Sequence, residues 1–109
     1  MADGPEALLP LIRSRHNSQL QLVAESRRRP PPAGDLFVVE GETLLGEVIR
    51  SGHAVLVLFA LDGPAASRFS GQAREVFRVT APVMEKISGL KSVSPVLAVC
   101  RCQSSWQDR

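Results

Sequence analysis

The chain has 109 residues, of which 44% are hydrophobic and 22% are charged, and its formal net charge is +2. These values are typical of one globular domain, and a chain of this length buries roughly 65% of the surface that its unfolded form exposes. The longest apolar run, residues 54–61, is far shorter than the ~20 residues that cross a bilayer. The composition therefore excludes a membrane span, and we expect residues 1–109 to form a single domain with no membrane partner.

Residues 1–12 combine leucines with a glycine and two prolines, which predicts a flexible arm or a short helix. Asn17 or Ser18 then begins a helix that runs to about Arg28, because a capping side chain accepts a hydrogen bond from an otherwise unpaired amide. Its apolar stripe has helical spacing and consists of Leu20, Val23 and Ala24. Three prolines at residues 30–32 end the helix, since proline lacks the amide hydrogen.

Residues 36–40 are typical of a strand, and the corner Glu40-Gly41 leads directly into a helix of about ten residues. The predicted buried face of this helix consists of Leu44, Leu45, Val48 and Ile49. Gly41 and Gly46 have the spacing of a phosphate-binding loop, but Glu47 stands where that motif needs a lysine. We therefore exclude such a loop and interpret Gly46 as a small residue that lets the helix approach the sheet.

The second half of the chain continues to alternate between strands and helices. The expected elements are a strand at 54–59, a turn at 62–64, a weak helix at 65–73, a strand at 76–79, a helix capped by Thr80, and a strand at 96–102. Every position of the strand at 54–59 is apolar, which is typical of a central, parallel strand covered on both faces. The alternation predicts an α/β fold, a three-layer α/β/α sandwich around a four-stranded, largely parallel or mixed sheet.

Cys100 and Cys102 are the only cysteines, and we expect two free, reduced thiols in a cytoplasmic protein, with an organelle as the alternative location. A zinc site usually needs four Cys or His ligands. His16 and His53 have no ligand-like spacing to the cysteines, so we expect no metal.

The carboxyl end of a strand in an α/β sheet is where ligands gather, which makes Glu40 a candidate functional residue. No serine or cysteine stands with a histidine and an acid in the pattern of a catalytic triad. A partly buried carboxylate must find hydrogen-bond donors, so we interpret Glu40 as structural, accepting backbone amides from a neighbouring turn. The alternative is a role as a general acid or base.

Basic residues gather in the first third of the chain, at Arg13, Arg15, Arg27, Arg28 and Arg29. Such a cluster is typical of a surface that binds a polyanion. The alternative is a solvated helix end, where the helix dipole favours basic residues. Stacking on bases also needs exposed rings. We expect Phe37, Phe59 and Phe77 to lie in the core, leaving Phe69 and Trp106 at the surface.

Three short segments occur in a characteristic order: RSRHN at residues 13–17, FVVEGE at 37–42 and SPVLAV at 94–99. Their order and spacing, over residues 12–101, resemble the N-terminal substrate-binding domain of SpoU/TrmH-type RNA 2′-O-ribose methyltransferases. The resemblance implies a fold like that of ribosomal protein L30e, in agreement with the predicted sandwich.

By this resemblance the chain is the part of an rRNA or tRNA 2′-O-ribose methyltransferase that docks structured RNA. The residues implied to face RNA are Arg13, Ser14, Arg15, His16, Asn17, Arg27, Arg28 and Arg29, while Glu40 and Gly41 match a structural corner. The family also has a C-terminal domain that binds S-adenosylmethionine, carries catalysis and forms a homodimer. Residues 103–109 would be a polar tail or the start of the linker to it. The chain itself would then hold no cofactor or catalytic residue and be inactive alone.

Two alternatives stay open. One is a stand-alone RNA-binding protein of the ribosomal L7Ae/L30e kind, which needs no catalytic partner. The other is a protein-interaction or assembly domain, whose apolar surface would consist of Leu8, Leu9, Leu11 and Ile12. The prolines at 30–32 and the short segment at 61–74 depart from the family's pattern, which leaves the loops that would face RNA undefined.

Overall fold

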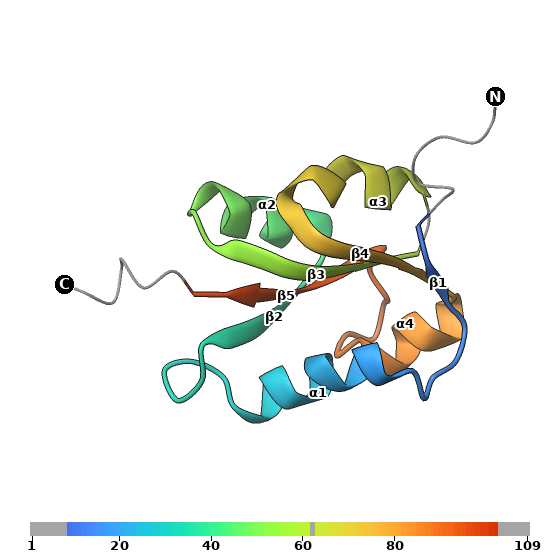
Figure 1. The fold of residues 1–109 in the computed structure, drawn as a ribbon, viewed down its shortest axis with the longest axis horizontal. Coiled ribbons are helices and arrows are strands. Elements are labelled where there is room, and N and C mark those ends of the chain that lie inside the picture. The colour runs from blue at the N-terminus through green and yellow to red at the C-terminus, as the bar shows by residue number, and fades with distance from the viewer. Residues whose placement is uncertain (1–8, 62, 103–109) are drawn as a thin grey trace.

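The computed structural model describes residues 9–61 and 63–102 (Figure 1). The elements in chain order are β1 (Leu11–Ile12), the 3-10 helix η2 (Ser18–Leu20), α1 (Gln21–Arg28), β2 (Leu36–Glu40), α2 (Glu42–Arg50), β3 (Ala54–Ala60), α3 (Gly63–Phe69), the 3-10 helix η3 (Ser70–Gln72), β4 (Ala73–Val79), α4 (Ala81–Ile87) and β5 (Val96–Arg101). Strands and helices alternate as the sequence predicts.

Within these residues the strands form one sheet of five, in the order β1-β4-β3-β5-β2. β4 pairs in parallel with both β1 and β3, whereas β5 pairs antiparallel with both β3 and β2. β5 is therefore the one reversed strand of this sheet, and the other four strands end at the same edge. The predicted α/β/α sandwich with a largely parallel or mixed sheet is confirmed, with one strand more than expected.

Helices cover both faces of the sheet (Figure 1). α1 and α4 lie on one face, where Val23 and Val83 share a hydrophobic cluster with the β3 residue Phe59. α2 and α3 lie on the other face, where Leu45 shares a second cluster with the β3 residue Leu58. Because β3 sends side chains into both clusters, each of its positions has to be apolar, which explains its uninterrupted hydrophobic sequence.

The strand that sequence reasoning missed is β1. Leu11 and Ile12 pair in parallel with the end of β4, and the Ile12 side chain is buried. The Arg78 guanidinium donates two hydrogen bonds of 3.4 Å to the Leu9 carbonyl, which fixes the chain just before this strand. The prediction of a flexible arm or helix is thus wrong for residues 11–12, and the proposed protein-docking surface loses its buried member, Ile12. Leu8, Trp106 and residues 103–109 lie outside the described residues.

Two predicted helical stripes are too wide. In α1, Leu20 of the preceding turn and Val23 are buried as expected, but Ala24 is exposed. In α2, Leu45 is buried whereas Leu44 is 53% exposed, although it was predicted to face the sheet. Each of these helices packs on one sheet only, so positions at the border of its apolar stripe remain exposed.

The interpretation of Gly46 is also wrong. A side-chain carbon at this position would lie 3.5 Å from the guanidinium of Arg50, on the same helix, and would meet no sheet atom of the described residues within 4 Å. The predicted turn at 62–64 is wrong for residues 63–64, which begin α3, while Asp62 is not described. β4 starts at Ala73 rather than at residue 76, because Ala73 pairs with Val55 of β3.

Both cysteines are free, as predicted, and both are buried. Burial, with a smaller contribution from the neighbouring Cys102 thiol, raises the pKa of Cys100 from 9.0 to about 12. The thiolate is the reactive form of cysteine, so Cys100 is chemically inert in the folded protein. His53 packs edge-on against Phe37, with ring centres 5.6 Å apart.

Candidate nucleic-acid interface

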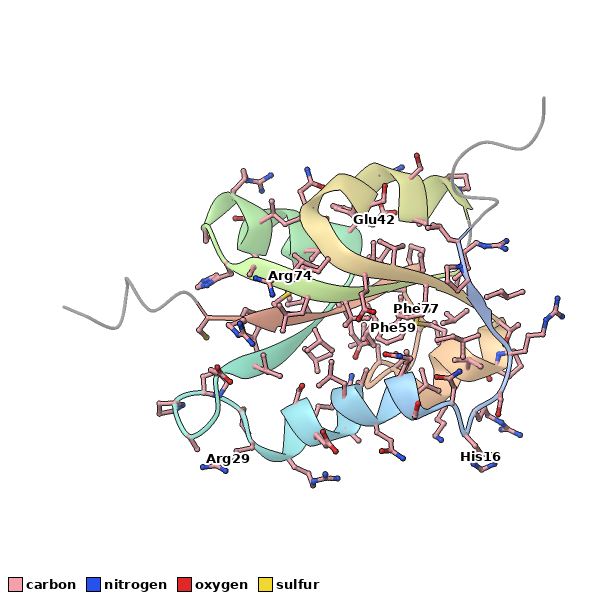
Figure 2. All side chains as sticks on the ribbon, viewed as in Figure 1. His16, Arg29, Glu42, Phe59, Arg74 and Phe77 are labelled. Carbon is pink, nitrogen blue, oxygen red and sulfur yellow. The ribbon has the colours of Figure 1, made fainter. Side chains whose placement is uncertain are left out.

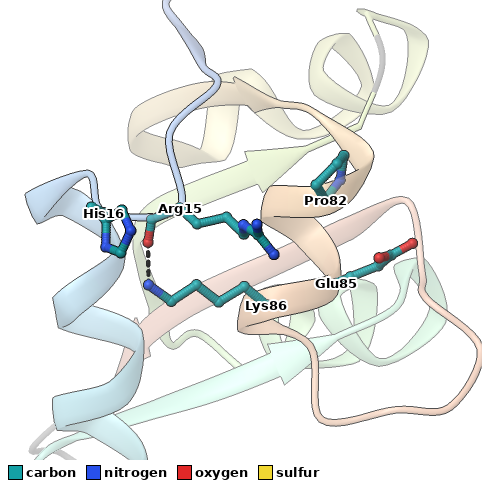
Figure 3. Close-up of a pocket in the computed structure, with 5 residues that line it drawn as sticks. All are labelled: Arg15, His16, Pro82, Glu85 and Lys86. Atoms are coloured by element: carbon teal, nitrogen blue, oxygen red, sulfur yellow. Dashed lines mark hydrogen bonds between the residues drawn. The ribbon is translucent and has the colours of Figure 1, made fainter.

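The candidate interface forms where β1 and β4 end. These neighbouring strands are parallel, so the segments that follow them, residues 13–17 and α4, leave the same edge of the sheet side by side. This is the edge at which α/β proteins commonly bind ligands. A shallow pocket of about 500 Å³ lies between the two segments (Figure 3). Its lining residues are Arg15, His16, Pro82, Glu85 and Lys86.

Residues 13–17 form a tight turn that holds its basic side chains outward. The Asn17 amide donates to the Ser14 carbonyl at 3.2 Å, and the His16 amide donates to the Ser14 hydroxyl at 3.1 Å. The Asn17 side-chain oxygen accepts from the Gln19 amide at 2.8 Å and caps the following turn, as the sequence predicts. Ser14 and Asn17 therefore shape the turn, while Arg13, Arg15 and His16 are exposed.

Lys86 joins this turn from α4, and its ammonium group donates a hydrogen bond to the Arg15 carbonyl (Figure 3). The side chains of Arg15 and Lys86 run past each other in opposite directions, whereas the Glu85 side chain extends away from Arg15 (Figure 3). A second hollow of about 390 Å³ also borders Arg15, His16 and Lys86 and continues along α1. Sequence reasoning missed Lys86, because its place beside Arg15 follows from the pairing of β1 with β4.

Arg27 has a different environment from the other candidate residues. Its guanidinium donates to a Glu40 carboxylate oxygen at 2.8 Å and also to the Ile87 carbonyl. Glu40 additionally accepts from the Ser88 hydroxyl and from the Gly89 amide, each at 2.7 Å. The backbone amide that the sequence analysis expected for Glu40 is thus provided by Gly89. Arg27 and Glu40 together tie α1 to the end of β2 and to the chain after α4.

Gly41 has the backbone conformation that its corner requires. Its φ of +101° is a region that residues with a side chain rarely adopt. The Gly41 amide donates to the Val96 carbonyl at 3.1 Å, and its own carbonyl accepts from the Leu45 amide at 3.0 Å. The corner therefore connects β2, β5 and the first turn of α2.

Arg28 and Arg29 are exposed but lie at the far end of α1. η2 and α1 separate them from the 13–17 turn by roughly 18 Å, from the rise per residue of the two helix types. Figure 2 shows His16 and Arg29 at opposite ends of this helix. Arg29 borders separate hollows that also contain Asp35. The structure thus gathers Arg15 and His16 with Lys86 but does not bring Arg28 and Arg29 to them.

The described residues were also compared with the requirements of a metal site and of a membrane-spanning helix. They contain no group of three or more His, Cys, Asp or Glu side chains able to hold a metal ion. None of their helices has the length and apolar character that a membrane crossing requires.

Phe69, which we expected at the surface, is half-buried and packs against the core beneath α2 and α3.

No known protein-family model matches the chain, and neither does any curated protein. Solved structures do match it. An rRNA methyltransferase from Sinorhizobium meliloti gives a TM-score of 0.66 at 14% identity, over 87% of this chain and 38% of that one. An RNA 2′-O-ribose methyltransferase gives 0.64 at 17% identity, over 84% of this chain and 37% of that one. An AdoMet-bound rRNA methyltransferase from S. meliloti gives 0.64 at 14% identity, over 87% and 37%.

These matches define the fold of the chain. The fold is similar to one part of two rRNA methyltransferase chains and of one RNA 2′-O-ribose methyltransferase chain. The chain spans 37–38% of the length of those proteins.

Proposed function

We propose that this chain is the RNA-binding part of an RNA 2′-O-ribose methyltransferase, and that it docks structured RNA through the turn at residues 13–17 and Lys86. The observation that carries the proposal is the convergence of Arg15, His16 and Lys86 at one sheet edge, in a fold similar to such enzymes. Methyl transfer from S-adenosylmethionine would belong to a part of the enzyme outside these residues, through which the enzyme would also form a homodimer.

The exposed cations suit this role physically. A guanidinium group makes paired hydrogen bonds to phosphate oxygens and stacks on unpaired bases. Arg13, Arg15 and Lys86 are exposed at the interface and would bind phosphate, while Ser14 and Asn17 keep the turn in shape. Arg27 acts in the fold through its ion pair with Glu40, and Arg28 and Arg29 would form a second, separate contact.

The proposal is tested by filter binding of the 109-residue chain to a structured rRNA or tRNA fragment across a salt series. With three cations meeting phosphates, log affinity should fall against log salt with a slope of about −2, from the coefficient for single strands. The triple variant Arg13→Ala/Arg15→Ala/Lys86→Ala should bind weakly and lose most of this slope. Absent or salt-independent binding by the unmodified chain would overturn the proposal.

A matched control separates local contacts from net charge. The variant Arg50→Ala/Arg68→Ala/Arg74→Ala removes the same charge from three exposed arginines on α2, α3 and β4. It should retain most of the RNA affinity. Thermal melting of both variants checks that the domain remains folded. Equal losses of affinity in the two triple variants would assign binding to overall charge and contradict a defined interface.

A further inference from the structure

Among the described residues, His16 is the one aromatic side chain that is exposed. The four phenylalanines, Phe37, Phe59, Phe69 and Phe77, are buried or half-buried and belong to or pack against the two core clusters. His53 is half-buried and packs against Phe37. Any stacking of a base on this surface must therefore use the imidazole of His16 or the flat guanidinium of an arginine.

The ring of His16 lies at two surface hollows that also contain two cationic side chains. The ring borders both hollows of the interface, and each hollow also contains Arg15 and Lys86. The larger hollow, about 500 Å³, falls within the ~300–1,000 Å³ typical of small-ligand sites. The exposed Lys86 ammonium spends one of its three N–H donors on the Arg15 carbonyl and keeps two for a ligand.

We propose that this pocket holds one unpaired nucleotide of an RNA loop, with its phosphate between Arg15 and Lys86 and its base stacked on the His16 ring. The inference rests on the proposed function and narrows it, because it names the class of RNA that the interface selects. The physical basis of the inference is that Arg15, Lys86 and the His16 ring line the same pocket. Arg15 lines the pocket from the turn and Lys86 lines it from α4, while the Glu85 side chain extends away from Arg15 (Figure 3).

A paired A-form helix does not fit this arrangement. Its bases are stacked on each other within the duplex, so their faces are not available to a protein side chain. A duplex could reach the cations only through its backbone, and it would leave His16 without a partner. An unpaired loop base can turn outward and meet the ring while its phosphate meets the cations.

The test compares two RNAs in fluorescence anisotropy with the 109-residue chain: a labelled hairpin with an unpaired loop, and a blunt duplex with the sequence of its stem. We expect the hairpin to bind about tenfold more tightly, the effect of one stacked base. His16→Ala should weaken hairpin binding by about the same factor and leave duplex binding unchanged. His16→Phe, which retains a flat ring, should restore hairpin binding.

The possible failures are distinguishable. If the chain binds both RNAs equally, or if His16→Ala binds the hairpin as the unmodified chain does, the nucleotide pocket is refuted while the proposed RNA-binding function stands. If neither RNA binds, both proposals fall. Folding of His16→Ala is checked by thermal melting, and we expect it to be retained because the His16 amide, not its ring, bonds to Ser14. Should it be lost, His16→Phe carries the test, and weakened hairpin binding by a folded His16→Phe would overturn the pocket.

Discussion

Glu40 joins segments that are distant in the sequence. Its carboxylate is only 12% exposed and accepts hydrogen bonds from Arg27, Ser88 and Gly89. A carboxylate so enclosed needs this set of donors, and Arg27 provides the compensating charge. In the run of three exposed arginines at residues 27–29, Arg27 is thus tied into the fold by its ion pair, a distinction from Arg28 and Arg29 that residue type alone does not reveal.

Replacing Glu40 tests this structural role. Glu40→Ala should lower the free energy of unfolding by about 2–3 kcal/mol, because it removes the ion pair of Arg27 and the acceptor of the Gly89 amide. The measurement is urea unfolding. The control is Glu47→Ala, which removes an exposed ion pair with Arg50 and should cost less than about 0.5 kcal/mol. Equal losses of unfolding free energy in the two variants would show that the hydrogen bonds of Glu40 stabilise the fold no more than an exposed ion pair does.

Cys100 gives the fold a dependence on alkaline pH. Its pKa is about 12 in the folded protein, above the ordinary 9.0, so its contribution to stability is complete below pH 9 and is lost as pH rises from 9 to 12. Between about pH 8 and pH 10.5 the unmodified chain should lose roughly 1–2 kcal/mol more unfolding free energy than Cys100→Ala. Urea unfolding at both pH values measures this difference. Equal losses of unfolding free energy in the two proteins would contradict a raised pKa of the Cys100 thiol.

At the scale of elements, strong local patterns were sufficient for several predictions. The strand at residues 36–40 and the helix that begins after Thr80 match the structure. β1 could not be predicted, because two residues carry no periodicity and their partners in β4 are distant in the sequence. The position of Lys86 was missed for the same reason. The candidate site therefore depends on a long-range strand pairing that local sequence patterns do not contain.

Gly46 provides a direct check on the packing of α2. Because a side chain there would meet only the Arg50 guanidinium at an ordinary contact distance, Gly46→Ala should raise the free energy of unfolding by about 0.5–1 kcal/mol. Thermal or urea unfolding would detect the gain. Gly41→Ala is the contrasting variant, since its φ of +101° predicts a loss of about 1–3 kcal/mol. A lower free energy of unfolding for Gly46→Ala would instead support the prediction from the sequence, that this glycine allows the helix to approach the sheet.

At the scale of the whole molecule, the sheet topology decides where the exposed basic side chains lie. α2 and α3 cover one face and carry the ion pairs Arg50–Glu47 and Arg68–Glu42. α1 and α4 cover the other, and the basic turn emerges where β1 and β4 end (Figure 1). The chain-wide charge of +2 contains no sign of this arrangement. The fold, rather than net charge, positions the cations of the proposed interface.

The most direct test of the central claim is to map the RNA contact on the backbone amides of the 109-residue chain by NMR, with a structured RNA fragment as the probe. We predict that the largest chemical-shift changes lie at residues 13–17 and 83–87, with small changes on α2 and α3. A map centred on α2 and α3, or no change at saturating RNA, would contradict the proposed interface.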